Sequence, residues 1–207
     1  MKKIDARSLT RAENYKLLIG SVVPRPIAFV TSQNRDGIIN GAPFSFFNIV
    51  TAEPPLISIS VGRKPTGEKK DTSANIDELK EFVVHIVDET NVNGINQSSA
   101  NYPSGKSEIE DIGFTQIPSE VVGVPSIKES KLRLECKLHQ TIPLGGTEDD
   151  PRTDLIIGEV VYYHIADECI VNGEIDTDLL NPLSRLGKTE YGGIGRTFSL
   201  PRPKYEE

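Results

Sequence analysis

The alternation of hydrophobic and polar positions predicts a chain built largely from β-strands. Residues 131–139 alternate strictly between polar and apolar side chains, which is typical of a strand with one exposed face. Residues 56–61 alternate between apolar residues and serine, so this strand is expected to carry hydroxyl groups on one face. Apolar runs at 26–32, 82–87 and 155–165 predict further strands.

Short helices are expected between these strands, rather than one helix after every strand. Helical patterns occur at residues 7–20, 71–80 and 90–100. A doubly wound parallel sheet needs a crossover helix for each strand, so this order favours an antiparallel barrel or sandwich with helical insertions. The Gly-rich, acidic segment 143–154 predicts a loop before the last long strand.

A single domain over residues 1–207, mainly β with short helices, is the organisation that this pattern favours. No linker-like stretch and no internal repeat divides the chain, and its length is sufficient for a sizeable core. A helical lead-in occupies about residues 1–20, and a turn-rich tail occupies about residues 166–207. Ile and Val together outnumber Leu, which favours β structure in the core.

Composition and charge exclude several classes of protein. The formal net charge is −7 and no strongly basic stretch is present, which argues against a nucleic-acid-binding surface. No run approaches the roughly 20 apolar residues of a membrane span, and the N-terminal residues lack the apolar core of a signal peptide. We therefore expect a cytoplasmic protein that works away from membranes.

Cysteine and histidine are too scarce for a Cys-rich metal centre or a disulfide scaffold. Cys136 and Cys169 are the only cysteines and allow at most one disulfide, so a reduced protein is the simpler interpretation. None of the three histidines has the spacing of a metal ligand, so no metal is expected. His85 lies inside an apolar strand and is interpreted as a core histidine with satisfied hydrogen bonds. No side chain is assigned a catalytic role.

Small and polar residues gather at the corner of a predicted hairpin. Thr31 and Ser32 end its first strand, and residues 40–45 (NGAPFS) follow in the second. Gly41 would let a flat ligand approach the backbone closely, and Pro43 would interrupt the sheet and leave neighbouring N–H groups free to face a ligand. The alternative is a hairpin corner made of ordinary turn residues.

A second group of residues has the character of a phosphate site. Ser58 and Ser60 project from one face of their strand, Arg63 follows, and residues 69–72 (KKDT) begin a predicted helix. The unpaired N–H groups and the dipole of a helix N-terminus attract anions. The spacing is that of neither a Walker loop nor a dinucleotide fingerprint, so a solvated basic loop before a capped helix remains the alternative.

A third group lies near the C-terminus, where residues 182–187 (PLSRLG) precede Tyr191. The guanidinium of Arg185 is suited to clamp an acidic group, and the ring of Tyr191 is suited to stack on a flat ligand. A C-terminal turn that is pinned to the body of the domain is the alternative.

Taken in order, these segments resemble the flavin reductase-like family of FMN-binding split-barrel proteins. The likeness runs from about residue 17 to about residue 203. It rests on six motifs, which are PRPIAFVT at 24–31, NGAPFSFF at 40–47, EPPL at 53–56, KDT at 70–72, NI at 75–76, and RLG at 185–187 with Tyr191. Each motif is short, but their common order is fairly specific for the family, though not for one reaction within it.

The resemblance implies a six-stranded antiparallel FMN-binding split barrel and a homodimer with FMN near its interface. By their places in the motifs, the residues assigned to the isoalloxazine and ribityl parts of FMN are Thr31, Ser32, Asn40, Ala42 and Ser45. Those assigned to its phosphate are Ser60, Arg63, Lys70 and Thr72. Arg25 is expected to order the site, and Arg185 and Tyr191 are expected to cover it. Arg185 and Tyr191 would cover the site of their own subunit or that of the second subunit.

An FMN-binding oxidoreductase is the function that the resemblance implies. Electrons would pass from NADH or NADPH through FMN to free flavin or to a partner protein. The alternatives are a flavoredoxin-like electron carrier that NAD(P)H does not reduce, and a non-catalytic FMN-binding module. No ribose-phosphate signature in the sequence selects between NADH and NADPH.

Overall fold

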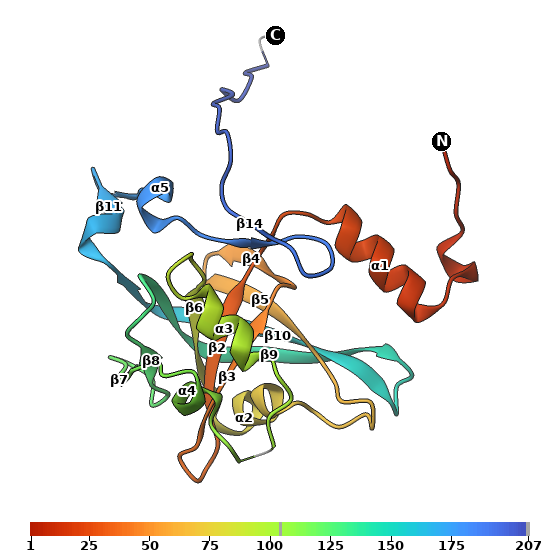
Figure 1. Cartoon of the computed structure of the whole chain (residues 1–207), viewed down its shortest axis with the longest axis horizontal. Helices are drawn as coiled ribbons and strands as arrows, with labels where there is room; N and C mark the ends of the chain where they lie inside the picture. The colour runs from red at the N-terminus through yellow and green to blue at the C-terminus, as the bar shows by residue number, and fades with distance from the viewer. Residues whose placement is uncertain (104, 206–207) are drawn as a thin grey trace.

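An antiparallel sheet of seven strands forms the centre of the computed structural model, which describes residues 1–103 and 105–205 (Figure 1). The order across the sheet is β3–β2–β6–β9–β10–β5–β4. These strands are β2 (Ala28–Gln33), β3 (Ile39–Phe44), β4 (Phe47–Ala52), β5 (Pro55–Gly62), β6 (Glu81–Ile86), β9 (Leu132–Gly146) and β10 (Pro151–Ile165). Strands β3 and β4 are its two edges, so the sheet is not closed into a barrel within the described residues.

The prediction of six strands is wrong, because the sheet contains seven. One of its edges, β4, pairs with β5 from Phe47 opposite Ile59 to Ala52 opposite Pro55. All residues of β4 after Phe47 are exposed, so no alternation of burial marks this segment as a strand. Its extended conformation comes from backbone pairing with β5 across the tight turn between them.

The remaining elements are short and lie around the sheet. They are η1 (Ala6–Ser8), α1 (Arg11–Ser21), β1 (Arg25–Pro26), α2 (Asp71–Leu79), α3 (Val92–Ser98), α4 (Glu108–Asp111), β7 (Gln116–Ile117), β8 (Ser126–Ile127), η2 (Asp167–Cys169), β11 (Ile170–Val171), β12 (Glu174–Ile175), α5 (Thr177–Leu180), β13 (Ser184–Arg185) and β14 (Tyr191–Gly192). Within the described ranges, none of these helices combines the length and apolar character needed to cross a bilayer. Helix α1 and the chain after β14 reach away from the sheet (Figure 1).

Strands β9 and β10 are longer than the sequence predicts, and the expected loop at 143–154 is wrong. The ladder pairs Pro143 with Asp154 and Leu144 with Thr153, so the connection shrinks to residues 147–150. Gly145 and Gly146 lead into this turn with φ values of 70° and 69°, which suit glycine. Pairing between the two long strands therefore overrides the local turn preference of proline and glycine.

The apolar run at 26–32 is explained by β2, whose side chains are buried on both faces. Ala28 and Val30 pack in the larger apolar cluster together with Phe82. Phe29 points to the other face and packs in a second cluster with Ile109 of α4. Burial on both faces removes the polar–apolar alternation that a half-exposed strand would show.

His85 is a buried core residue, which confirms its interpretation from the sequence. Its Nδ1 lies 3.1 Å from the carbonyl oxygen of Phe29, and its Nε2 accepts a hydrogen bond from the N–H of Ile127 at 2.9 Å. Burial lowers the pKa of His85 to about 3, so the ring is neutral and Nδ1 carries the proton. Cys136 and Cys169 are also buried, and they do not form a disulfide.

Candidate functional site

The candidate site is a groove beside the free edge of β3. A cavity of about 560 Å³ lies between β3, the segment 64–70, the start of α2 and the segment 98–102. A second cavity of about 220 Å³ shares Pro43, Phe44 and Ser99 with the first and continues toward α1 and β14. The larger volume falls within the range of about 300–1,000 Å³ that is typical of small-molecule sites.

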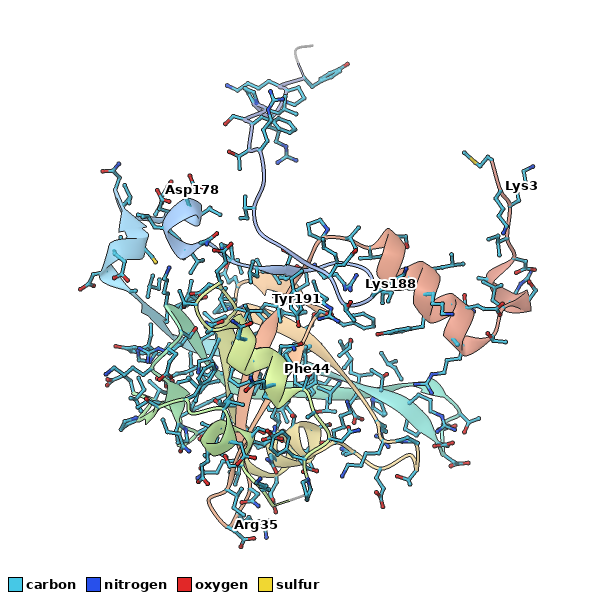
Figure 2. All side chains as sticks on the ribbon, viewed as in Figure 1. Lys3, Arg35, Phe44, Asp178, Lys188 and Tyr191 are labelled. Atoms are coloured by element: carbon cyan, nitrogen blue, oxygen red, sulfur yellow. The ribbon has the colours of Figure 1, made fainter. Side chains whose placement is uncertain are left out.

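Most of the residues that the sequence assigned to a cofactor line this groove. The eight that do so are Asn40, Ala42, Lys70 and Thr72 in the larger cavity and Arg25, Ser45, Arg185 and Tyr191 in the smaller one. Ser60 lies instead in a third cavity of about 380 Å³, which also touches Arg25 and Ser45. Figure 2 shows Phe44 of β3 near Tyr191 and Lys188, which line the smaller cavity with it.

One end of the groove combines a lysine with the start of helix α2. Lys70 provides the carbonyl that accepts the first backbone hydrogen bond of the helix, so the N–H groups of residues 71–73 have no helical partner. Thr72 Oγ1 accepts a hydrogen bond from Asn40 Nδ2 at 2.8 Å, which ties the helix to β3. The exposed Lys70 and these N–H groups make this end suitable for an anion.

Glu108 and Asp71 are two of the three carboxylates that border the larger cavity, and sequence reasoning missed Glu108. Glu108 is buried, and its Oε2 accepts a hydrogen bond from the backbone N–H of Gly41 at 3.0 Å, so this N–H is not free to face a ligand. Burial raises the pKa of the Glu108 carboxyl. The Asp71 carboxylate lies 3.2 Å from Lys64 Nζ. No local signal marks Glu108, because its partner lies 67 residues away.

Arg63 points away from the groove and into a buried ion pair. Its Nε and Nη2 donate hydrogen bonds to Asp154 Oδ1 at 3.2 Å and 2.7 Å, and its Nη1 donates to the carbonyl of Gly67. The second carboxylate oxygen of Asp154 accepts a hydrogen bond from Ser73 Oγ at 2.9 Å. In this arrangement Arg63 stabilises the fold beside α2, and its contact with a phosphate stays a prediction.

Thr31 and Ser32 are both buried in β2, and neither lines the groove within the residues that the structure describes. Thr31 Oγ1 donates a hydrogen bond to the carbonyl of Pro125 at 2.9 Å. Ser32 Oγ accepts one from Asn75 Nδ2 at 3.2 Å, which connects β2 to α2. Both hydroxyls support the strand behind the groove, and their contact with a flavin stays a prediction.

Arg25 is a buried arginine that orders the region around the smaller cavity. Its Nη1 donates hydrogen bonds to the carbonyls of Ile19 and Val22 at 2.8 Å and 2.6 Å, and its Nη2 donates to that of Leu186 at 2.9 Å. One guanidinium therefore joins the end of α1 to the segment that carries β13. Its role in ordering a cofactor site stays a prediction.

Arg185 and Tyr191 line the smaller cavity of their own chain, and their covering of a cofactor stays a prediction. They are paired across β13 and β14, and the guanidinium of Arg185 lies 4.5 Å from the ring centroid of Tyr191. Tyr191 Oη donates a hydrogen bond to Asn96 Oδ1 at 3.0 Å, which connects β14 to α3. A cation above an aromatic ring contributes to holding both side chains in place.

Comparison with known proteins identifies related sequences and structures. The family described as flavin reductase like domain matches residues 19–177. Nitrilotriacetate monooxygenase component B from Bacillus cereus is 52% identical, with 97% of this chain and 98% of that chain covered and a TM-score of 0.95. The 2-nitrobenzoate 2-nitroreductase from Pseudomonas fluorescens is 34% identical, with 100% and 98% covered and a TM-score of 0.88. A split-barrel protein from Shewanella frigidimarina is 23% identical, with 95% and 96% covered, and its TM-score of 0.81 shows the same fold.

These matches agree with the order of motifs in the sequence and with the open sheet. The family match spans most of the chain, from the end of α1 to the start of α5. The mainly β architecture with few short helices is that of the split barrel, here with seven strands in its main sheet. The chain therefore belongs to the flavin reductase-like domain family.

Proposed function

We propose that the protein is an FMN-binding oxidoreductase that passes electrons from NADH or NADPH, through FMN, to free flavin or to a partner protein. The observation that carries this proposal is the groove along β3, where residues from widely separated motifs meet. Similarity to a monooxygenase component and to a nitroreductase supports oxidoreductase chemistry.

The residues that line the groove fit the chemical groups of FMN. Lys70 and the unpartnered N–H groups of α2 suit the phosphate, and the Asn40 amide and Thr72 hydroxyl suit the ribityl chain. Phe44 and Tyr191 offer aromatic surface for the ring system at the other end. FMN, when bound, supplies the hydride and electron-transfer chemistry, while these residues bind it, orient it and exclude water.

A homodimer is part of the proposal, because an apolar surface lies open beside the groove. Leu18, Val22 and Phe46 line the cavity of about 380 Å³ on this surface, and Val22 is 58% exposed. Ile49 on the edge strand β4 is 76% exposed. Open apolar patches mark interaction surfaces, and an uncovered edge strand invites pairing. A second copy of the chain would cover both features and close the groove from outside.

Light scattering tests the dimer, with an expected mass of twice the 22.8 kDa of one chain. Ile49→Asp places a charge in the apolar surface and should shift the protein toward monomers. Val121→Asp is the matched control, because Val121 is an exposed apolar residue outside this surface and its substitution should leave the dimer intact. A wild-type monomer with full flavin affinity would contradict the dimer as part of the site.

An absorption spectrum followed by anaerobic titration tests the enzymatic proposal. Protein purified from cells supplied with FMN should be yellow and should release FMN on heating. NADH or NADPH should then bleach the flavin band within seconds, and added FMN should be turned over. If dithionite bleaches the band but neither nucleotide does, the protein is an electron carrier instead. If flavin binds and no donor or acceptor reacts, it is a non-catalytic FMN-binding module.

A further inference from the structure

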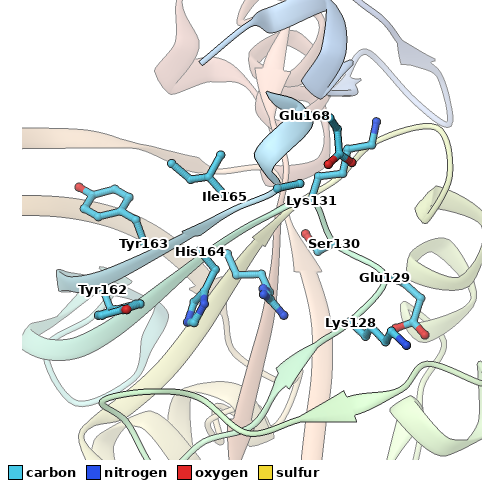
Figure 3. A pocket seen from close by; sticks show the side chains of 11 residues that line it. Lys128, Glu129, Ser130, Lys131, Tyr162, Tyr163, His164, Ile165 and Glu168 are labelled. Carbon is cyan, nitrogen blue, oxygen red and sulfur yellow. The ribbon is translucent and has the colours of Figure 1, made fainter. Parts of the chain in front are cut away.

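A cavity of about 480 Å³ lies on the β9–β10 hairpin, at the end where β9 begins and β10 finishes. Among the described residues, it shares no lining residue with the three cavities along β3 and β4. Figure 3 shows residues that line it, which come from β10 and from residues 128–131, the segment that leads into β9. Tyr162 and His164 lie on one face of β10, and Tyr163 lies on the other. This cavity is therefore separate from the proposed flavin site.

Arg133 lines this cavity as a cation without a partner. Its Nε is shielded from solvent and has no hydrogen-bond partner in the part of the chain that the structure describes. Its guanidinium forms no ion pair with the described carboxylates. Burial lowers the pKa of Arg133, although Glu135 partly offsets this effect. Because a guanidinium stays charged in proteins, an anion in the cavity would pair with its two Nη groups, for which no hydrogen bond to a described residue is present.

The carboxylate that acts on Arg133, Glu135, is already engaged by other groups. It is completely buried, and its Oε1 lies 2.6 Å from His164 Nε2. Its two oxygens also accept hydrogen bonds from the backbone N–H groups of residues 120–122, at 2.6 Å, 2.7 Å and 3.0 Å. Burial alone raises the pKa of Glu135, but these contacts outweigh it and lower the pKa. Glu135 thus attracts Arg133 without a hydrogen bond to it.

The other charges around the cavity favour an anion at its centre. Lys128 and Lys131 add two positive charges, and Lys131 Nζ donates one hydrogen bond to a backbone carbonyl at 3.0 Å. Glu129 has both carboxylate oxygens 3.0 Å from the N–H of Thr115, which directs its charge away. Glu168, which is exposed at the rim, and the buried Glu135 are the groups that oppose an anion.

We infer that this cavity binds a small oxyanion, the phosphate or carboxylate group of a low-molecular-weight ligand. Arg133 donates hydrogen bonds to it, since a planar guanidinium matches two oxygens of either group. Lys128 strengthens the attraction from the rim. Tyr162 is 42% exposed, and its ring centroid lies 4.9 Å from that of His164, the residue opposite Arg133 in the β9–β10 ladder. Its hydroxyl group and ring face are therefore on the same side of the strands as Arg133.

Isothermal titration calorimetry of the full chain with inorganic phosphate and, separately, with benzoate tests this inference. Arg133→Gln should weaken binding about tenfold or more, because it removes the charged donor. Since the side chain of Arg133 makes no hydrogen bond to the described residues, this variant is expected to fold. Lys128→Gln should cause a smaller loss. Lys137→Gln removes the same charge from an exposed position of β9 outside the cavity and should bind like the wild type.

Comparing the affinities for the two ligands also distinguishes a phosphate site from a carboxylate site. Tighter binding of phosphate indicates a phosphate group, whereas tighter binding of benzoate indicates a carboxylate on a ring that contacts Tyr162. The inference is overturned if neither anion binds saturably, or if Arg133→Gln and Lys137→Gln weaken binding equally. Because the start of α2 is itself proposed to bind a phosphate, each titration is repeated with Lys70→Gln, and the loss caused by Arg133→Gln should persist there. Binding, not flavin reduction, is the readout, so failure here is distinguishable from failure of the proposed function.

Discussion

The backbone N–H of Gly41 on the edge strand β3 donates a hydrogen bond to the buried carboxylate of Glu108 at 3.0 Å. Gly41 also has no space for a side chain, because a Cβ atom there would lie 2.3 Å from Ile109 Cδ1 and 2.8 Å from Phe29 Cζ. Strand β3 and helix α4 are therefore in direct contact behind the groove. Glu108 satisfies an amide that the sheet itself leaves unpaired.

Replacing Glu108 separates its role as an acceptor from its charge. Glu108→Ala leaves the Gly41 N–H without its protein acceptor and should lower the free energy of unfolding by about 1–3 kcal/mol. Glu108→Gln keeps an oxygen that accepts this hydrogen bond and should lose clearly less. Urea unfolding at neutral pH measures both. Equal losses in the two variants would contradict an acceptor role for Glu108.

The buried pair of Arg63 and Asp154 predicts a larger loss of stability. Asp154→Asn leaves the half-buried guanidinium without its anion, and breaking such a pair typically costs about 3–5 kcal/mol of unfolding free energy. Asp111→Asn is the matched control, because the ion pair of Asp111 with Lys106 is exposed and screened by solvent. Urea unfolding should show a large shift for the first variant and almost none for the second.

The β-rich class and the positions of the main strands could be predicted, because apolar runs and alternation report which faces are buried. The sequence predictions were wrong where backbone pairing, and not the burial of side chains, holds a segment in the extended conformation. Strand β4 is exposed after Phe47, and the tip of the β9–β10 hairpin contains Pro143 and two glycines. The apolar residues of β4 are exposed and the hairpin tip is turn-rich, so in both segments the extended conformation depends on the partner strand.

The candidate site was predictable where its residues lie in short local motifs. Asn40, Lys70 and Thr72 fall into this class, and the structure brings them to one cavity. Arg63 was assigned to a ligand because a loop cation before a helix suggests an anion site. Its actual partner, Asp154, comes from a strand 91 residues away, and no local pattern reveals such a pairing.

The buried, neutral His85 predicts a specific pH dependence of stability. Its pKa is about 3 in the folded protein and near 6.5 in the unfolded chain. Between these values the unfolded chain binds a proton that the folded protein does not. The contribution of His85 to the free energy of unfolding is therefore fully present above about pH 6.5. It is lost as the pH falls toward 3, by up to about 1.4 kcal/mol per pH unit. Urea unfolding at several pH values should show this slope in the wild type and not in His85→Asn.

An exposed histidine provides the control for this pH dependence. His139 lies on the exposed part of β9, and His139→Asn should keep the slope of the wild type. If His85→Asn and the wild type show the same change in unfolding free energy between pH 7 and pH 5, His85 is not held neutral by burial.

Gly158 on β10 predicts a site of overpacking. A Cβ atom at this position would lie 2.3 Å from Cζ of Phe82, which is fully buried in the larger apolar cluster. Gly158→Ala should therefore lower the free energy of unfolding by about 1–3 kcal/mol. Gly62→Ala on the neighbouring β5 is the control, because its Cβ would meet no atom within 4 Å. Thermal unfolding of the two variants should separate them, and equal melting temperatures would contradict the packing argument.

Lys70 predicts how the protein distinguishes FMN from riboflavin, which lacks the phosphate. The wild type should bind FMN more tightly, and Lys70→Gln should weaken FMN binding about fivefold while leaving riboflavin binding unchanged, as expected for one exposed charge pair. Lys80→Gln removes the same charge from the opposite end of α2 and should not change either affinity. Flavin fluorescence titration measures all three proteins, and added salt should reduce the difference between wild type and Lys70→Gln. Equal affinity of the wild type for FMN and riboflavin would mean that no phosphate binds at the start of α2.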